Sequence, residues 1–233
     1  MKKMKAMVLT LCACIVMMGC NNLGKGTAIG AAGGALLGAV VGKIAGNTAV
    51  GAAVGTAVGA GAGALIGKHM DKVKAQAQAV QNAQVQSITD ANGLQAVQVT
   101  FDSGILFTTG SSTLSATAKN SLSQFARDVL IPNQDCDVAV QGFTDNAGWK
   151  NSTAAQSQQK NLNLSQQRAQ AVTNYLQSVG VSASQIRSTT GFGEANPVAD
   201  NSTAAGKAQN RRVEVLLYAS QAMINAAEAG TLQ

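Results

Sequence analysis

The chain carries the stretch VAVQGFTD at residues 138–145, and its second half is best understood outward from there. The two valines alternate with smaller or polar neighbours, a pattern typical of a β-strand with one buried face. The strand is predicted to end at Gly142, and Thr144 and Asp145 follow it. A hydroxyl and a carboxylate are therefore expected where this strand ends.

Helices and strands alternate on both sides of this strand. Apolar residues recur at helical spacing behind Ser115, a good N-cap residue, and Pro132 stops that helix. The other predicted elements are a strand over 97–101, a helix over 165–180, and strands over 186–192 and 213–217. This alternation predicts an α+β fold, a two-layer βαβαβ sandwich.

The N-terminus has the features of a secretion signal. Lysines precede an uncharged apolar run of thirteen residues, 6–18, which is too short to span a bilayer. The run ends in Met17-Met18-Gly19-Cys20, which resembles a bacterial lipobox. Residues 1–19 are therefore predicted to be a lipoprotein signal peptide, with Cys20 acylated and made the new N-terminus. The alternative is an ordinary secretory peptide with a chance cysteine.

Glycine recurs every fourth residue over 26–46 and again over 51–67. This period is close to one helical turn, so the glycines fall along one stripe of each helix and permit close helix packing. Residues 20–70 are predicted to hold the lipidated cysteine and a glycine-zipper hairpin, with helices over 26–46 and 49–67. Two interpretations of this segment stay open. In the first, the hairpin inserts into the membrane or drives oligomerisation. In the second, it is a water-tolerant hairpin or a flexible spacer.

The segments that flank the predicted domain are poor in large side chains. All eight aromatic residues lie after residue 100, so a globular domain is expected to begin only near residue 84. Residues 71–96 are interpreted as a linker and strand, with a solvated helix over 71–86 and a turn at Asn92-Gly93. Residues 220–233 are expected to be a frayed tail.

Charge and composition argue against several classes of function. Residues 1–74 hold eight Lys and one Asp (+7), whereas residues 75–233 hold nine Lys and Arg against ten Asp and Glu (−1). The predicted domain thus lacks the basic excess of a nucleic-acid-binding protein. With one histidine and no Cys-x-x-Cys, no metal, no cofactor and no catalysis are predicted. His69 is expected at the surface or at an interface rather than as a ligand, and Cys136 is expected to be a buried, inert thiol.

Five polar blocks stand at the ends of the predicted elements. They are Phe101-Asp102, Gly142-Phe143-Thr144-Asp145, Asn161-x-x-Leu164-Ser165-x-x-Arg168, Gly191-x-Gly193-Glu194-x-Asn196 and Asn210-Arg211-Arg212. In this order they resemble the OmpA-like C-terminal domain, a peptidoglycan-binding module, over residues 97–219. Together with the lipobox and the glycines, the chain is similar to glycine-zipper outer-membrane lipoproteins of the YiaD type.

The resemblance implies a ligand and a binding site. The ligand is the meso-diaminopimelate of the peptidoglycan stem peptide, whose side chain ends in an ammonium and a carboxylate. Asp145 would take the ammonium and Arg168 the carboxylate, helped by free N–H groups of a helix expected to begin close to Arg168. The remaining site residues implied are Thr144, Asn161 and Leu164, which would line the pocket, and Asp102 and Arg211, which would flank or brace it.

Residues 146–160 depart from the family pattern, whose loop is usually shorter here. This Ser/Gln/Ala-rich insert is expected either to lengthen the pocket wall or to bulge into solvent. Trp149 within it either stacks on a sugar or peptide or packs against its own domain.

The sequence therefore leads to the hypothesis that the protein is lipid-anchored in the cell outer membrane and binds peptidoglycan through a periplasmic domain. Neither catalysis nor nucleic-acid binding is expected. Asn21 after Cys20 favours the outer membrane, by resemblance to enterobacterial sorting. The alternative is a membrane-inserting homo-oligomer built on the glycine zipper, in which the C-terminal domain serves only as a wall anchor.

Overall fold

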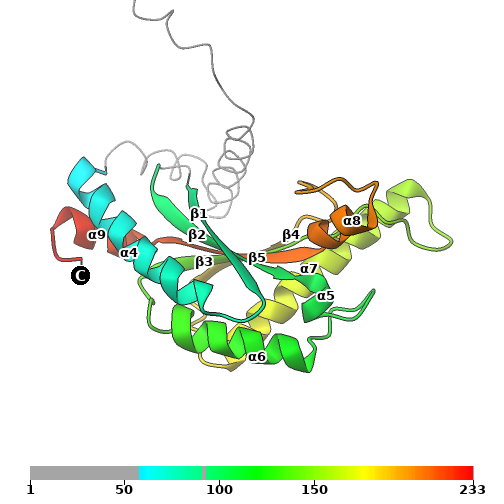
Figure 1. Cartoon of the computed structure of the whole chain (residues 1–233), viewed down its shortest axis with the longest axis horizontal. Coiled ribbons are helices and arrows are strands. Elements are labelled where there is room, and N and C mark those ends of the chain that lie inside the picture. Colours follow the sequence, from blue (N-terminus) through cyan, green and yellow to red (C-terminus); the bar gives the residue numbers. More distant parts are fainter. Residues whose placement is uncertain (1–57, 91–92, 233) are drawn as a thin grey trace, which may run out of the picture.

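The computed structural model describes residues 58–90 and 93–232 (Figure 1). The helices are α4 (Ala60–Gln78), α5 (Ser103–Leu106), α6 (Ala116–Phe125) with its π-helical continuation η1 (Ala126–Leu130), α7 (Ala154–Ser178), α8 (Ala204–Asn210) and α9 (Gln221–Glu228). The strands are β1 (Ala83–Thr89), β2 (Gln95–Asp102), β3 (Cys136–Gly142), β4 (Ile186–Gly191) and β5 (Arg212–Ala219).

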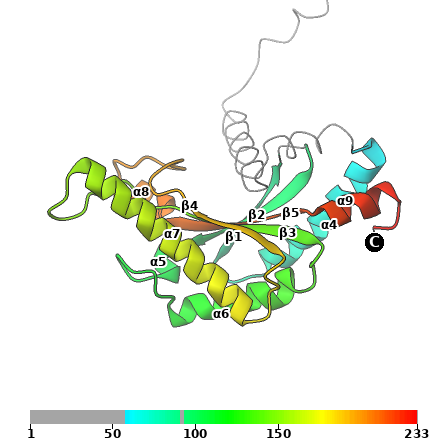
Figure 2. The same cartoon turned by 180° about the vertical axis from the view of Figure 1, so that it is seen from behind.

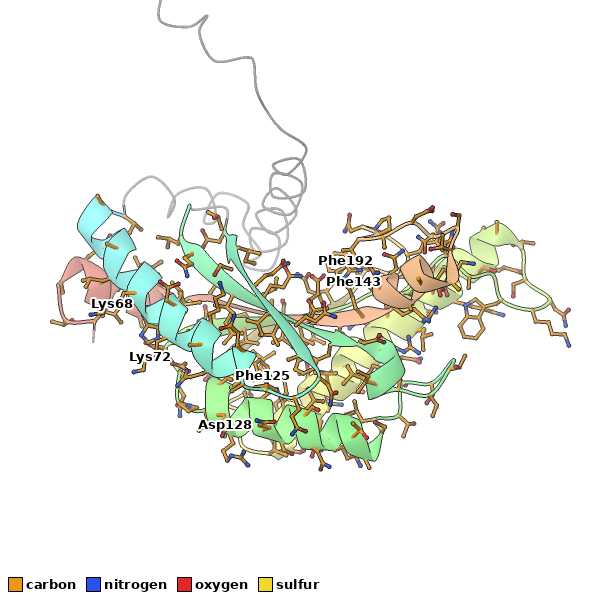
Figure 3. All side chains as sticks on the ribbon, viewed as in Figure 1. Lys68, Lys72, Phe125, Asp128, Phe143 and Phe192 are labelled. Carbon is orange, nitrogen blue, oxygen red and sulfur yellow. The ribbon has the colours of Figure 1, made fainter. Side chains whose placement is uncertain are left out.

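The five strands form one sheet in the order β1-β2-β5-β3-β4. Only β3 and β4 run parallel, and α7 makes the crossover that such a pair requires. Side chains of α4, α6 and α7 share one apolar core with one face of the sheet. Phe101 of β2 and Phe125 of α6 meet edge to face in it, with ring centroids 5.6 Å apart. Figure 3 labels Phe125. The predicted α+β two-layer fold is confirmed.

Two glycines set the position of α7 over the sheet. Gly142 and Gly191 are register partners at the ends of β3 and β4. A methyl group added at Gly142 would overlap the carbonyl oxygen of Ser165, and one added at Gly191 would overlap the backbone of Gln166. The helix backbone therefore crosses the strand ends at contact distance, which fixes the side chains of the following turn relative to Asp145.

Helix α7 begins earlier than expected. Thr153 caps it, in a capping box in which the Thr153 hydroxyl accepts from Gln156 N and the Gln156 side chain accepts from Thr153 N. The prediction of a start near residue 165 was wrong, and residues 154–160 form helix rather than a bulging insert. Figure 2 shows these first turns projecting beyond the sheet. These first turns of α7 contact little of the core. Their sequence correspondingly lacks a continuous apolar stripe.

Helix α4 corrects a second expectation. One face of residues 71–78 is buried rather than solvated, because Val73 and Ala77, like Met70 before them, are completely buried against the sheet and η1. The packed part of the chain therefore includes α4, which precedes residue 84, and the predicted linker helix ends before β1 starts at Ala83. Small and flexible side chains fill this part of the core, so it needs no aromatic residue.

The expectation of a frayed tail over 220–233 was wrong. Ser220 caps α9, and Met223 and Ala227 of this helix are buried beside α4. β1 and β2 form an antiparallel hairpin, and Gly93 of the predicted turn has φ +75°. Cys20 and the zipper positions before residue 58 lie outside the described residues. Within the described part of the chain, helices long and apolar enough to span a bilayer are absent.

Candidate functional site

A cleft of about 600 Å³ lies at the edge of the domain where β3 ends. Its walls come from α5 and the loop that follows, the segment after β3, the middle of α7, and the residues that precede β5. The lining residues are Ser103, Gly104, Phe107, Thr109, Gly110, Thr144, Asp145, Ala147, Gly148, Trp149, Lys150, Asn161, Leu164, Arg168, Lys207 and Arg211. Six of the seven predicted ligand-binding residues are among them.

Asp145 is 6% exposed at the base of the cleft. Its Oδ2 accepts a hydrogen bond from Arg211 Nη1 at 2.6 Å, and its Oδ1 accepts one from Ala147 N at 3.0 Å. Each oxygen of an ionised carboxylate can accept two bonds, so one acceptor position remains on each. The carboxylate is thus fixed in orientation and still able to accept from a ligand.

Arg168 is 4% exposed, and its guanidinium is held by a backbone carbonyl and an aromatic ring rather than by a counter-ion. Its Nε donates to Ser111 O at 3.0 Å, and its guanidinium carbon lies 5.1 Å from the centre of the Phe107 ring. Within the described residues, no carboxylate lies within ion-pair distance of it, and its terminal nitrogens make no hydrogen bond. Arg168 therefore brings two unused donor groups to the cleft.

The charge around Arg168 is unfavourable to it in the free protein. Burial, followed by the positive charge of Arg211, lowers the pKa of the Arg168 guanidinium, and the Asp145 carboxylate opposes this only in part. The group stays protonated because arginine titrates far above neutral pH. An anion in the cleft would compensate the buried charge of Arg168 and offset the repulsion from Arg211, so the site is complementary to a carboxylate.

Asp145 and Arg168, the two residues predicted to hold the ligand, both line the cleft. They do not pair with each other, because the ion-pair partner of Asp145 is Arg211, at the junction of α8 and β5. Arg168 lies about four turns inside α7, so the N–H groups at the start of that helix do not reach it. The expected support from a helix N-terminus was therefore wrong.

Asn161 braces the cleft wall. Its Oδ1 accepts from Trp149 Nε1 at 2.7 Å, and its Nδ2 donates to Ala147 O at 3.2 Å and to Glu194 Oε2 at 3.3 Å. A further donor contact to Asp145 O measures 3.4 Å. These bonds use the capacity of the amide, so Asn161 positions the loop after β3 and the indole rather than binding a ligand directly.

The other predicted residues take different positions. Thr144 lies in the cleft, and its buried hydroxyl has no hydrogen-bond partner in the structure. Leu164 supplies an apolar wall. Asp102 does not line the cleft, but it caps α5 by accepting from Gly104 N, and Ser103 and Gly104 line the cleft. Asp102 therefore acts as a bracing residue.

Sequence reasoning missed the two lysines of the cleft. Lys150 follows Trp149 in the loop, and Lys207 comes from α8. Isolated lysines in polar segments carry no signal of their own, and only the fold brings these two together. With Arg168 and Arg211 they give four cations against the single carboxylate of Asp145, a formal excess of +3.

The comparisons with known proteins agree with this architecture. Residues 1–71 match the YMGG-like Gly-zipper family, and residues 106–211 match the OmpA family. The chain is 38% identical over 152 residues to "Probable lipoprotein YiaD" of Escherichia coli K12, covering 65% of this chain and 64% of that protein. It is 41% identical over 90 residues to "Peptidoglycan-binding protein ArfA" of Mycobacterium tuberculosis H37Rv, covering 39% of this chain and 25% of that protein.

A solved structure shares the fold. The chain superposes on a MotB-like protein from Desulfovibrio vulgaris with a TM-score of 0.56 and 22% identity, over 68% of this chain and 99% of that one. The predicted blocks, the five-stranded sheet and the family match agree. Residues 106–211 of this chain are therefore similar to the OmpA family, and residues 1–71 to the YMGG-like Gly-zipper family.

Proposed function

We propose that this protein is an outer-membrane lipoprotein that binds peptidoglycan non-covalently through the meso-diaminopimelate of the stem peptide and so tethers the membrane to the cell wall. The observation that carries the proposal is the buried Arg168 guanidinium, which lines the cleft beside Asp145 without a carboxylate partner among the described residues. The relative ArfA, named for peptidoglycan binding, supports the ligand class.

The free end of meso-diaminopimelate is complementary to this pair of groups. Its carboxylate would accept from the two terminal nitrogens of Arg168, which a planar guanidinium can offer as a fork. Its ammonium would donate to the acceptor positions left on Asp145, whose orientation Arg211 holds. Lys150 and Lys207 would meet further carboxylates of the stem peptide.

We propose binding without catalysis. Asp145 is the one carboxylate among the described residues that line the cleft, and neither histidine nor cysteine lines it. Glycoside hydrolysis ordinarily uses a pair of carboxyl groups, and acyl transfer needs a nucleophile with a base. Weak ionic contacts suffice for a tether, because the lipid anchor and the wall polymer keep both partners at high effective concentration.

The anchor in this proposal is acylated Cys20 in the outer membrane, with the domain in the periplasm. The lipobox-like sequence and the similarity to "Probable lipoprotein YiaD" support it. Metabolic labelling of the full chain with an alkyne fatty acid tests it. Label should appear on the wild type and vanish in Cys20→Ser, whereas equal labelling of both would contradict the anchor.

Sedimentation of the full chain with purified sacculi tests the ligand. Arg168→Gln and Asp145→Asn should each lower the bound fraction, the former by about 1.5–3 kcal/mol or roughly 10- to 100-fold in affinity, the range for hydrogen bonds to charged groups. Arg127→Gln and Asp128→Asn are matched controls, since that ion pair is exposed and outside the cleft. They should bind like the wild type.

The source of sacculi separates diaminopimelate from other wall groups. Walls with lysine at the third stem position lack the second carboxylate, and the chain should bind them as weakly as Arg168→Gln binds diaminopimelate walls. Equal binding to both walls, or unchanged binding by both cleft variants, would overturn the proposal. Release of soluble fragments from sacculi would instead indicate an enzyme.

A further inference from the structure

His69, the single histidine of the chain, is in an environment that needs explanation. A position at the surface or at an interface was expected, whereas its side chain on α4 is only 10% exposed. Both ring nitrogens are buried and neither has a hydrogen-bond partner in the structure. Buried polar atoms in proteins are nearly always hydrogen-bonded, so two such nitrogens on one ring indicate a missing partner.

Two other ligand-type side chains lie next to this ring. The Asp135 carboxylate oxygen Oδ2 is 3.5 Å from His69 Nε2, and its side chain is 36% exposed. Cys136 is fully buried at the start of β3. One imidazole nitrogen, the Cys136 sulfur and one carboxylate oxygen all lie within 4.8 Å of one another.

We infer that His69, Asp135 and Cys136 form a binding site for a Zn²⁺-like divalent ion, separate from the peptidoglycan cleft. Imidazole nitrogen, thiolate sulfur and carboxylate oxygen are the donors that Zn²⁺ takes in proteins. Bonds of about 2.0–2.3 Å to a tetrahedral ion place its ligand atoms about 3.3–3.8 Å apart. The observed spacing therefore needs side-chain adjustments of about 1 Å, and water at the exposed side of Asp135 completes the coordination.

The thiol of Cys136 must lose its proton when the ion binds. Burial, reinforced by the charges of Asp135 and Asp137, raises the pKa of Cys136, so the metal-free thiol is protonated at neutral pH. Binding forms a sulfur–metal bond, breaks the S–H bond and releases one proton to water. The positive ion then neutralises the thiolate and the Asp135 carboxylate, which removes the electrostatic cost of a buried thiolate.

The site would join parts of the chain that are distant in sequence. Met70 beside His69 already contacts Cys136, with the two sulfur atoms 3.9 Å apart across 66 residues. An ion bound here would link His69 of α4 to Cys136 at the start of β3. Because only the folded chain brings the three donors together, occupancy would stabilise the packing of α4 on the sheet.

Cobalt titration of the full chain, purified in detergent, tests the inference. Cys12, Cys14 and Cys20 are replaced by serine so that Cys136 is the only thiol. Co²⁺ is a visible substitute for Zn²⁺ and gives a thiolate-to-cobalt charge-transfer band. We expect this band to saturate at one ion per chain, to disappear when Zn²⁺ is added, and to form with release of one proton.

Three variants assign the ligands. His69→Gln and Cys136→Ser should each weaken Co²⁺ binding at least about 100-fold, and Cys136→Ser should also lose the charge-transfer band. Asp128→Asn is the control for Asp135→Asn, because Asp128 pairs with Arg127 and is not one of the three clustered side chains. Asp128→Asn should bind like the parent chain, and Asp135→Asn more weakly.

Titration of the parent chain shows whether the metal site exists, even where a variant folds poorly. Absence of a saturable thiolate–cobalt band in the parent chain would overturn the site, and so would equal affinities of the parent, His69→Gln and Cys136→Ser. Binding to sacculi serves as the folding control. Since the cleft contains none of the three ligands, loss of the metal site leaves the proposed wall binding intact.

Discussion

Arg211 Nη1 donates to Asp145 Oδ2 at 2.6 Å, across 66 residues of sequence. The pair joins the start of β5 to the segment after β3, and it holds the carboxylate while Arg168 remains without an ion-pair partner among the described residues. Arg211 thus fixes the position of the acid. Under the proposed function, Arg168 is the arginine that meets the ligand.

Replacing Arg211 with glutamine should weaken binding to sacculi by about tenfold, because the Asp145 carboxylate loses the donor that orients it. Arg211→Lys should bind at an intermediate level, since it keeps the charge without the planar fork. Sedimentation with sacculi measures both. Arg187→Gln is the control, because its partner Asp137 is outside the cleft. Binding by Arg211→Gln at the wild-type level would contradict the orienting role.

Replacing Asn161 with alanine should loosen the cleft wall and lower the free energy of unfolding by about 2 kcal/mol, because the indole N–H and a loop carbonyl lose their partner. Trp149 is the only tryptophan, so its emission reports the change directly and should shift to the red. Asn163→Ala is the matched control, since Asn163 is exposed on the same helix and bonds only to Gln159. Identical emission from both variants would show that Asn161 does not hold the wall.

Replacing Gly142 with alanine should destabilise the domain by about 3 kcal/mol, because the new methyl group overlaps the Ser165 carbonyl and forces α7 away from β3. Urea unfolding measures the change. Gly61→Ala in α4 is the control, where the methyl group meets nothing within 4 Å and alanine favours the helix by up to about 1 kcal/mol. A Gly142→Ala chain as stable as the wild type would mean that the helix is free to shift.

Tyr218 should make the protein less stable in alkali. Burial, reinforced by the Asp137 charge and opposed by Arg187, raises the pKa of its phenol in the folded chain. Below about pH 10 both states hold the proton and the effect is absent. Above it only the unfolded chain ionises, so unfolding becomes easier by about 1.4 kcal/mol per pH unit until the folded phenol also titrates.

The comparison that isolates this contribution is urea unfolding of the wild type and Tyr218→Phe between about pH 9 and pH 11. The wild type should lose stability more steeply than the variant over this interval. Parallel losses would indicate that the phenol is not responsible.

The local elements of this protein follow from its sequence. Ser115 caps α6 through Ala118 N, as its position before an apolar helical stripe predicted. The alternating valines of 138–145 form β3, and Gly93 takes the positive φ that the hairpin turn needs. Such signals act between neighbours in the chain, so a single sequence is sufficient to find them. The order of the polar blocks likewise indicated the family resemblance and six of the residues that line the cleft.

Tertiary packing decided which of those residues meet. Whether Asp145 pairs with Arg168 or Arg211 depends on where α7 crosses β3, and the steric fit at Gly142 sets that crossing. The burial of α4 and the approach of His69 to Cys136 depend in the same way on contacts between segments far apart in the chain. Periodicity and capping describe one segment at a time, whereas charge pairing and burial are properties of surfaces that exist only after the segments pack.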